Sequence, residues 1–272
     1  MPAPDSYSLD QLSRLIGTPR APQVLDVRDA ADTAADPRRL PAAESILDGD
    51  PVAWAQMRPD RPIAVICQRG AKRAQARAAQ LRAAGFAAQV LEGGFEAWRD
   101  AGLPLLTSLA LPASDMQGRT IWVTRHRPKI DRIACPWLIR RFVDARAVFL
   151  FVAPAEVQAV AELTGGTAFD IEGVRFSHRG EGCTFDAMLD DFALHTPALD
   201  ALALIVRGAD TARPDLAPQA AGLLAISLGL SRMHSDDLAQ LDAAMPVYDA
   251  LYRWARDAQD ESHSWPGPGR RA

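Results

Sequence analysis

Cysteine and lysine are scarce in this sequence, and long apolar runs are missing from it. Its 272 residues include three cysteines, which lie far apart and form no Cys-x-x-Cys pair. An odd number of separated cysteines excludes a disulfide framework and predicts reduced thiols in a cytoplasmic protein. The first residues show neither the basic nor the apolar segment of a signal peptide. No apolar run reaches the roughly 20 residues that cross a bilayer, so no membrane partner is expected.

A surplus of basic residues is missing as well. The chain has 30 Lys and Arg against 34 Asp and Glu, which gives a net charge of −4. A dedicated nucleic-acid binder usually carries a basic surplus, so this balance argues against a nucleic-acid partner. What the chain does have is apolar content: 48% of its residues are hydrophobic, and its length is sufficient for two domains of ordinary size.

One segment, from Arg61 to Trp98, places a cysteine between a strand and a helix. The apolar, β-branched run at 61–66 predicts a short buried parallel strand. The Ala/Arg/Gln-rich run from Lys72 predicts a helix that Gly85 ends. Cys67 lies between them, where loop amides and the positive end of the helix dipole favour the reactive thiolate over the thiol.

Three motifs in the first two-fifths of the chain resemble the rhodanese family. They are VLDVR at 24–28, the CxxGx loop with a following basic residue at 67–72, and LEGGFEAW at 91–98, which continues to AGLP. The resemblance implies an α/β rhodanese-like domain with a central parallel sheet, here expected over residues 1–106. It also implies that the loop cysteine takes a sulfane sulfur from a small donor, holds it as a persulfide and passes it to a thiol acceptor.

The resemblance assigns the sulfur-carrying role to Cys67, with Lys72 at a position where the family often has arginine. The expected anion cradle consists of Gln68, Arg69, Gly70 and Ala71. Cys67 and Arg73 also satisfy Cys-x5-Arg, the spacing of phosphatase-like and arsenate-reductase-like relatives, in which the arginine grips an oxyanion. Gly70 favours the sulfurtransferase loop. The family's usual GHIPGA stretch is replaced by RLPAAES at 39–45, so substrate access there departs from the pattern.

Residues 119–258 are expected to form a second, mainly helical α+β domain after a linker at 107–118, with a disordered tail at 259–272. The patterns predict strands at 120–124 and 147–152, a hairpin of short strands at 168–171 and 174–177, and helices at 133–142, 156–163, 184–192 and 196–207. The run at 215–230 is apolar almost all round and predicts a central buried helix. A final amphipathic helix from Leu238 contains Pro246, which we expect to kink or split it.

This second segment resembles the chromate-resistance domain at the C-terminus of ChrB-type proteins. The motifs are WVTRHRPKIDRIACPWLIRRF at 122–142, FSHRGEGCTFDAML at 176–189 and VRGADTARPDLAPQAAGLLAISLGLS at 206–231. The resemblance implies a role in oxyanion or oxidative-stress defence. In ChrB proteins that regulate transcription, DNA binding belongs to a separate N-terminal region. A rhodanese-like domain occupies that place here, so the regulatory role is not carried over.

Two constellations in this segment could bind a ligand. His178 and Glu181, with Asp170 upstream and Asp210 and His234 further on, are ligand types that a divalent Fe, Mn or Zn ion accepts. The alternative is a purely structural role, in which the histidine makes backbone hydrogen bonds in a turn and the acidic residues lie at helix N-termini. Arg125, Lys129 and Arg132 surround a predicted helix start and suit chromate or another oxyanion. Ion pairs with Asp131 would instead neutralise that loop.

Three functions therefore remain open at this point. The first is a cytoplasmic sulfurtransferase fused to a chromate-resistance domain. The second is a sensor that binds a metal or chromate in the C-terminal domain, and the third is a metal-dependent redox enzyme in that domain. Cys135 and Cys183 are expected to be packed in the core. The oligomeric state, including a homo-oligomer, is left open.

Overall fold

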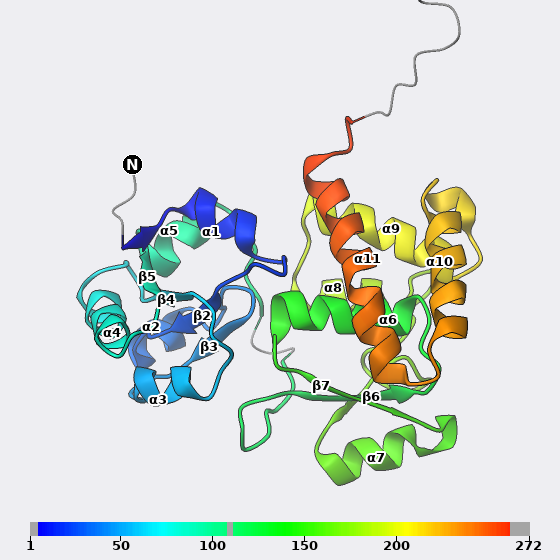
Figure 1. The fold of residues 1–272 in the computed structure, drawn as a ribbon, viewed down its shortest axis with the longest axis horizontal. Coiled ribbons are helices and arrows are strands. Elements are labelled where there is room, and N and C mark those ends of the chain that lie inside the picture. Colours follow the sequence, from blue (N-terminus) through cyan, green and yellow to red (C-terminus); the bar gives the residue numbers. More distant parts are fainter. Residues whose placement is uncertain (1–4, 108–110, 262–272) are drawn as a thin grey trace, which may run out of the picture.

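The computed structural model describes residues 5–107 and 111–261 of the chain. Figure 1 shows two groups of elements side by side, an N-terminal group in blue to cyan and a C-terminal group in green to red. Residues 108–110 of the expected linker and 262–272 of the expected tail lie outside the described residues.

The N-terminal group is built on a five-stranded parallel sheet. Its strands, in spatial order, are β1 (Ser6–Tyr7), β5 (Ala88–Leu91), β4 (Ile63–Ile66), β2 (Gln23–Asp26) and β3 (Ala43–Ser45). Each pair of neighbours is parallel. All residues of β4 are buried, as expected for a central strand that is covered on both faces. The central parallel sheet predicted for this part of the chain is confirmed.

The helices of this group lie between the strands in sequence. They are α1 (Leu9–Leu15), α2 (Ala30–Ala35), α3 (Pro51–Gln56), α4 (Lys72–Ala83) and α5 (Gly94–Asp100). Residues 32–49 are rich in proline, alanine and aspartate, yet they contain most of α2 and the edge strand β3. Asp29 caps α2 by accepting a hydrogen bond from the amide of Asp32. β3 is paired with β2 only, a long-range contact that the local pattern does not reveal.

The C-terminal group has a smaller parallel sheet in the order β7–β6–β8. Its strands are β6 (Ile121–Arg125), β7 (Val148–Val152) and β8 (Thr167–Ala168). The predicted hairpin after β7 is wrong: β8 pairs with β6, and Phe169 and Phe176 form a single parallel bridge. Both phenylalanine rings pack on Trp122, at centroid distances of 6.2 and 5.4 Å. Aromatic packing, and not a cross-strand ladder, brings these two segments together.

Helices make up most of the C-terminal group, as predicted. They are α6 (Asp131–Leu138), α7 (Val157–Thr164), α8 (Thr184–Phe192), α9 (Pro197–Asp210), α10 (Ala220–Met233) and α11 (Asp237–Asp257), with a π-helical turn at Ile139–Val143 after α6. Thr196 caps α9, and proline occupies its first turn as expected. Pro246 does not split α11, which runs through it as one helix.

Helix α10 is not the buried central helix that its composition predicts. Only four of its residues are buried, including Ser227 and Ser231, whereas Ile226 and Leu228 are 48% and 47% exposed. The helix lies at the edge of the group, beside α9 and α11 (Figure 1). Composition gave the wrong answer because burial depends on the neighbours of a helix, and this one has neighbours on a single face.

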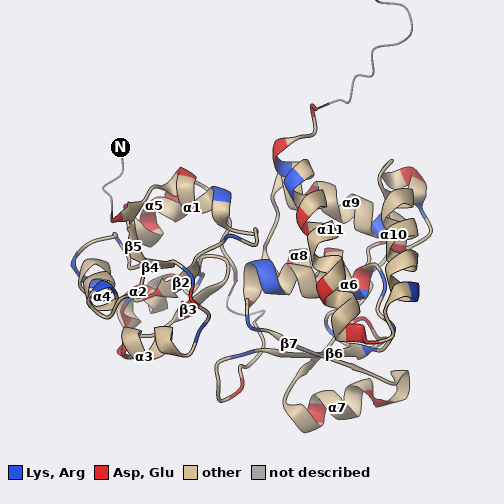
Figure 2. Ribbon diagram, viewed as in Figure 1, with Lys and Arg blue, Asp and Glu red and all other residues tan. Residues whose placement is uncertain are grey.

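The two groups share one hydrophobic core cluster, which includes Leu12 and Phe95 from the first group and Trp137 and Phe142 from the second. The turn after α1 comes closest: a Cβ added at Gly17 would lie 2.9 Å from Cε1 of Phe142. The ring of Phe142 packs in turn on Tyr252 of α11 at a centroid distance of 5.5 Å. Figure 2 shows basic and acidic residues interspersed over both groups. Among the described residues, no helix is long and apolar enough to cross a membrane.

The contact at Gly17 predicts a stability effect. We expect Gly17→Ala to lower the free energy of unfolding by about 1–3 kcal/mol, because the new methyl group overlaps the packed ring of Phe142. Gly85→Ala is the matched control. Both glycines have positive φ, but a Cβ at Gly85 meets nothing within 4 Å. Urea denaturation should show the larger loss for Gly17→Ala, and equal losses would contradict a steric role for this interface.

Candidate functional site

Cys67 lies directly after β4, at the carboxyl end of the sheet, and α4 begins five residues later. The thiol is 6% exposed, and its Sγ lies 4.0 Å from the carbonyl oxygen of Ala71. Ala71 is the N-cap of α4 but supplies no side-chain hydrogen bond to the helix start. The first-turn amides of α4 therefore have no side-chain cap, and this is the arrangement that favours an anion.

The Cys67 loop is fixed by the glycine turn before α5. The amide of Phe95 donates to the carbonyl of Cys67, and the amide of Glu96 donates to the carbonyl of Gln68, both at 3.0 Å. Gly70 has φ +64°, and a Cβ there would lie 2.9 Å from the amide nitrogen of Gly93. Only a glycine permits this backbone conformation and close approach without strain. The CxxG and LEGG motifs thus meet in space and set the shape of one loop.

The polar side chains predicted around Cys67 bind other groups or face solvent. Gln68 donates to Glu96 at 3.2 Å and Arg69 donates to it at 3.0 Å. Arg73 donates to the carbonyl of Leu47 at 3.3 Å, and Lys72 is exposed. The side chains of Gln68 and Arg69 thus help to hold the loop, Arg73 is directed to Leu47, and Lys72 faces solvent.

In the C-terminal group, two of the three predicted oxyanion ligands meet on one carboxylate. Arg125 donates to Oδ2 of Asp170 at 2.7 Å, and Nε of Arg132 lies 3.1 Å from the same oxygen. Lys129 lies apart from them, in a small hollow with Ile226 and Tyr248. These two arginines are therefore ion-paired, but with Asp170, which lies outside the loop, whereas the sequence suggested pairing with Asp131.

His178 is at the centre of a cluster of carboxylates. Its Nε2 lies 3.3 Å from Oδ2 of Asp131, 3.5 Å from Oδ1 of Asp170 and 3.3 Å from Oδ2 of Asp210. Asp131 and Asp170 are buried, whereas the His178 side chain is 45% exposed. Of the other predicted metal ligands, Glu181 is exposed. His234 follows α10 and has its carbonyl bound by Arg127.

The sequence did not identify Asp131 as part of this cluster. Its carboxylate also accepts hydrogen bonds from the Cys135 thiol at 3.0 Å and from the amide of Thr184 at 2.8 Å. An acidic residue at the start of an apolar helix reads as a helix-dipole partner, so nothing local marks it as a ligand. Its neighbours come from α8, α9 and the loop of His178, and only the fold brings them together.

Burial governs the electrostatics of the cluster. Desolvation raises the pKa of Asp210 to about 7, with the nearby charge of Asp131 adding to the effect. Desolvation and Asp131 also raise the pKa of Asp170 against the opposing influence of its two arginines. The hydrogen bond with Asp131 raises the pKa of His178 to about 9. A positive charge is therefore strongly favoured at the point where the three carboxylates converge.

The two cysteines of this group are packed, as expected. Cys135 and Cys183 are both fully buried free thiols. Burial raises the pKa of each thiol well above its usual range, and the charge of Asp131 acts in the same direction. A thiol held neutral in this way is a poor nucleophile, which leaves Cys67 as the better candidate for sulfur chemistry.

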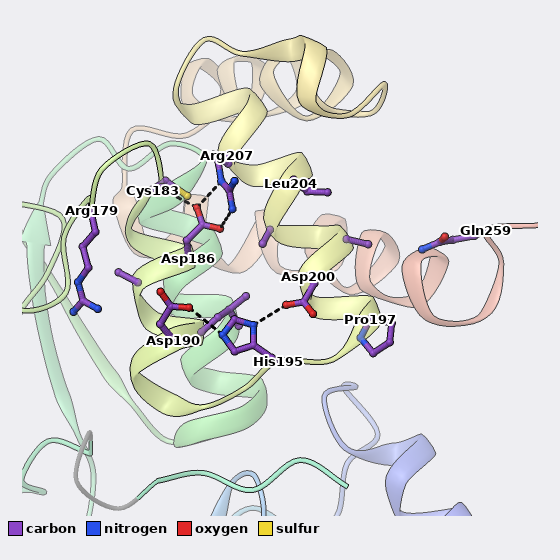
Figure 3. Close-up of a pocket in the computed structure, with 15 residues that line it drawn as sticks. Arg179, Cys183, Asp186, Asp190, His195, Pro197, Asp200, Leu204, Arg207 and Gln259 are labelled. Carbon is purple, nitrogen blue, oxygen red and sulfur yellow. Dashed lines mark hydrogen bonds and ion pairs between the residues drawn. The ribbon is translucent and has the colours of Figure 1, made fainter. Parts of the chain in front are cut away.

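A hollow of about 640 Å³ lies between α8 and α9 (Figure 3). His195 lies within it, with Nδ1 2.8 Å from Asp200 and Nε2 3.0 Å from Asp190. Arg207 donates to Asp186 at 2.6 and 3.0 Å on the other side of the hollow. These polar groups pair with one another. They therefore shape the hollow but do not indicate which ligand it would bind.

Each of the two groups of elements matches a known protein family. Residues 8–101 match the model of the rhodanese-like domain, and residues 122–255 match the model described as ChrB, C-terminal domain. The chain is a rhodanese-like domain followed by a ChrB C-terminal domain. The resemblances stated for both segments, and the predicted fold class, are confirmed. Cys67 and its glycine turn lie in the rhodanese-like domain, and the His178 cluster lies in the ChrB-type domain.

The individual relatives cover parts of the chain. Protein ChrB of Cupriavidus metallidurans is 35% identical over 137 residues, which are 50% of this chain and 40% of that protein. A rhodanese-related protein from Thermoplasma volcanium is 25% identical, with 37% of this chain and 96% of that chain covered and a TM-score of 0.30. A thiosulfate sulfurtransferase from Pseudomonas aeruginosa is 24% identical, with 56% and 30% covered and a TM-score of 0.33. The chain thus spans about two-fifths of the length of the curated relative it matches.

The carboxylates around His195 predict a pH effect. The hydrogen bond with Asp200 raises the pKa of His195 above its ordinary value. The charged His195 therefore contributes fully to stability below about pH 6.5, and this contribution is lost as the pH rises through the raised pKa. NMR titration of the imidazole should show a midpoint above 6.5 that falls in Asp200→Asn. Asp215→Asn, which removes an exposed partner of Arg213, should leave the midpoint unchanged; equal behaviour of the two variants would contradict the assignment.

Proposed function

We propose that this protein is a sulfurtransferase that carries a sulfane sulfur as a persulfide on Cys67. The observation that supports it is the position of this thiol, between the end of a central strand and an uncapped helix start, in a loop held by the Gly93–Gly94 turn. The match to the rhodanese-like domain agrees with this position. We place the activity in the cytoplasm, because all three cysteines are free thiols.

The reaction would proceed as two displacements. The Cys67 thiolate attacks the outer sulfur of a donor such as thiosulfate, a new S–S bond forms, and the donor's S–S bond breaks with release of sulfite. A thiolate acceptor then attacks the outer sulfur of the persulfide, and the Cys67 thiolate leaves. The persulfide bears a negative charge that the main-chain amides at the start of α4 would stabilise.

The Cys-x5-Arg alternative has weaker support in the geometry. In a phosphatase-like site the arginine would hold an oxyanion beside the cysteine. The Arg73 guanidinium instead donates to Leu47, and its NH1 lies 3.9 Å from Asp48. Gly70 and the glycine turn, by contrast, fit the sulfurtransferase loop.

Mass spectrometry tests the persulfide. After incubation with thiosulfate and removal of excess donor, the intact protein should gain the mass of one sulfur atom, located on the peptide of Cys67. Reduction with dithiothreitol should remove it. Cys67→Ser should gain no mass, whereas Cys135→Ala should gain as much as the wild type, because Cys135 is fully buried. Sulfur found on Cys135 or Cys183, or on no cysteine of the folded protein, would contradict the proposal.

A second proposal concerns the ChrB-type domain, for which we propose a divalent metal site. Asp131, Asp170 and His178 offer ligand atoms that all lie within 4.8 Å of one another. Asp210 lies beside them. Carboxylate oxygens with one imidazole suit Mn, Fe or Zn. A metal ion would take the place of the His178 proton as the positive charge among these carboxylates.

The proposed role in defence against chromate or other oxyanions comes from the family of this domain. An oxyanion that bound Arg125 and Arg132 would have to displace Asp170 from both arginines. Oxyanion binding at this place therefore remains a prediction, and the geometry of the cluster favours a cation.

Metal analysis tests the second proposal. Protein dialysed against Mn²⁺ or Zn²⁺ and then desalted should retain metal, and Asp170→Asn should bind it at least about tenfold more weakly, because a ligand is lost. Glu181→Gln removes an exposed carboxylate from the same loop as His178 and should bind metal like the wild type. Equal retention by both variants, or no retention by the wild type, would contradict the site.

A further inference from the structure

Strand β7 forms an open edge of the C-terminal sheet. Among the described residues it pairs only with β6, and with five residues it is the longest edge strand they contain. The other edge strands, β1, β3 and β8, have two or three residues. Proteins usually protect such an edge with a charged side chain, a proline or a bulge. β7 has none of these, because its five residues are apolar and in unbroken register with β6.

The hydrogen bonds of β7 show which of its main-chain groups face the open edge. The amide of Val148 donates to the carbonyl just before β6 at 2.9 Å, and the carbonyl of Val152 accepts from the amide just after β6 at 2.8 Å. In a parallel pair, alternate residues of a strand direct both of their main-chain groups to the same neighbour. Phe149 and Phe151 therefore direct their amides and carbonyls away from β6, to the open edge.

A hollow of about 490 Å³ follows this edge. Four consecutive residues of β7, 149–152, line it, although the side chains of a strand alternate between the two faces of the sheet. The hollow therefore lies beside the strand and not over one face. Its walls are Val160 of α7 on one face and residues 235–238, at the start of α11, on the other (Figure 1). Because α7 packs over β6 and β8, it leaves room for a strand beside β7.

The sequence of this strand reads the same in both directions. Residues 147–153 are Ala-Val-Phe-Leu-Phe-Val-Ala, with Leu150 at the centre. When two copies are placed antiparallel about Leu150, valine lies opposite valine, phenylalanine opposite phenylalanine and leucine opposite leucine. Phe149 and Phe151 are then the residues that exchange main-chain hydrogen bonds, about four in total, and they are the residues whose groups face the edge.

The charges beside the edge are complementary under the same pairing. The Arg140 guanidinium carbon lies 5.1 Å from the ring centroid of Phe149. Asp236 lines the hollow, and its neighbour Asp237 accepts from a main-chain amide two residues after β6, so both lie at the carboxyl end of the strands. The antiparallel register places Phe149 of one copy opposite Phe151 of the other, next to these carboxylates. A cation of each copy thus approaches a carboxylate of the other.

We infer that β7 pairs with β7 of a second copy of this chain, across a two-fold axis at Leu150. The two three-stranded sheets then join into one continuous sheet. Identical surfaces meet across such an axis, so the contact closes on itself and gives a dimer and not a fibre. An extended segment of another protein would gain only the main-chain bonds, without the symmetric side-chain pairs or the charge match. The inference depends neither on sulfur transfer at Cys67 nor on a metal at His178.

Disulfide trapping tests the register on the full chain. Leu150→Cys should give a disulfide-linked dimer under mild oxidation, because a residue on the axis faces itself at a Cα separation of about 4.5 Å, within reach of a disulfide. Val152→Cys is the matched control: it lies on the same face of the strand and is half-buried like Leu150, but it faces Val148 of the other copy. It should link only when it is mixed with Val148→Cys. The three native thiols are all buried, so the wild type should not link.

Sedimentation velocity tests the association itself. The wild type should be dimeric at about 100 µM and dissociate on dilution. Phe151→Pro should be monomeric at that concentration, since proline removes an amide that faces the edge and no bond to β6. Phe151→Ala also loses the ring but keeps the amide, so it should still dimerise, with about tenfold weaker affinity.

Three outcomes would overturn the inference. They are a wild type that is monomeric at about 100 µM, a folded Phe151→Pro variant that dimerises like the wild type, and Val152→Cys that links with itself as readily as Leu150→Cys. Circular dichroism shows whether Phe151→Pro is folded. If it is not, failure of Leu150→Cys to link in a folded, concentrated sample would overturn the inference in its place.

Discussion

The free-energy cost of burying charged side chains determines how the ionisable groups of this protein are paired. In the ChrB-type domain, Asp131 and Asp170 are taken out of water, and their charge is balanced by His178 and by two arginines. Such a network is stable only while every member has its partner.

A second constraint acts in the rhodanese-like domain, where backbone packs on backbone. The Cys67 loop and the Gly93–Gly94 turn approach so closely that a Cβ at Gly94 would lie 2.9 Å from the carbonyl carbon of Arg69. This packing leaves the thiol little exposed and gives the loop one shape. The side chains of Gln68 and Arg69 then strengthen that shape through Glu96. Preorganised amides cost no reorganisation when a charge develops, which is why a rigid loop suits a persulfide better than a flexible ring of cations.

The two domains are joined through packing as well as through the chain. Phe142 extends into contact with the turn at Gly17, and Arg146 reaches Glu44 across the junction. Within the segment at 39–45, Leu40 belongs to this shared core.

The sequence by itself determined what depends on local order and on motifs. The strand before Cys67, the helix after it and the identity of both domains could be read from spacing and residue type. Only the tertiary structure decided the pairing of β3 and β8, the exposure of α10, and the meeting of Asp131 and Asp210 at His178. It also decided that Arg125 and Arg132 are both paired with Asp170. The physical reason is that burial and charge compensation depend on neighbours far apart in the chain, which no local pattern contains.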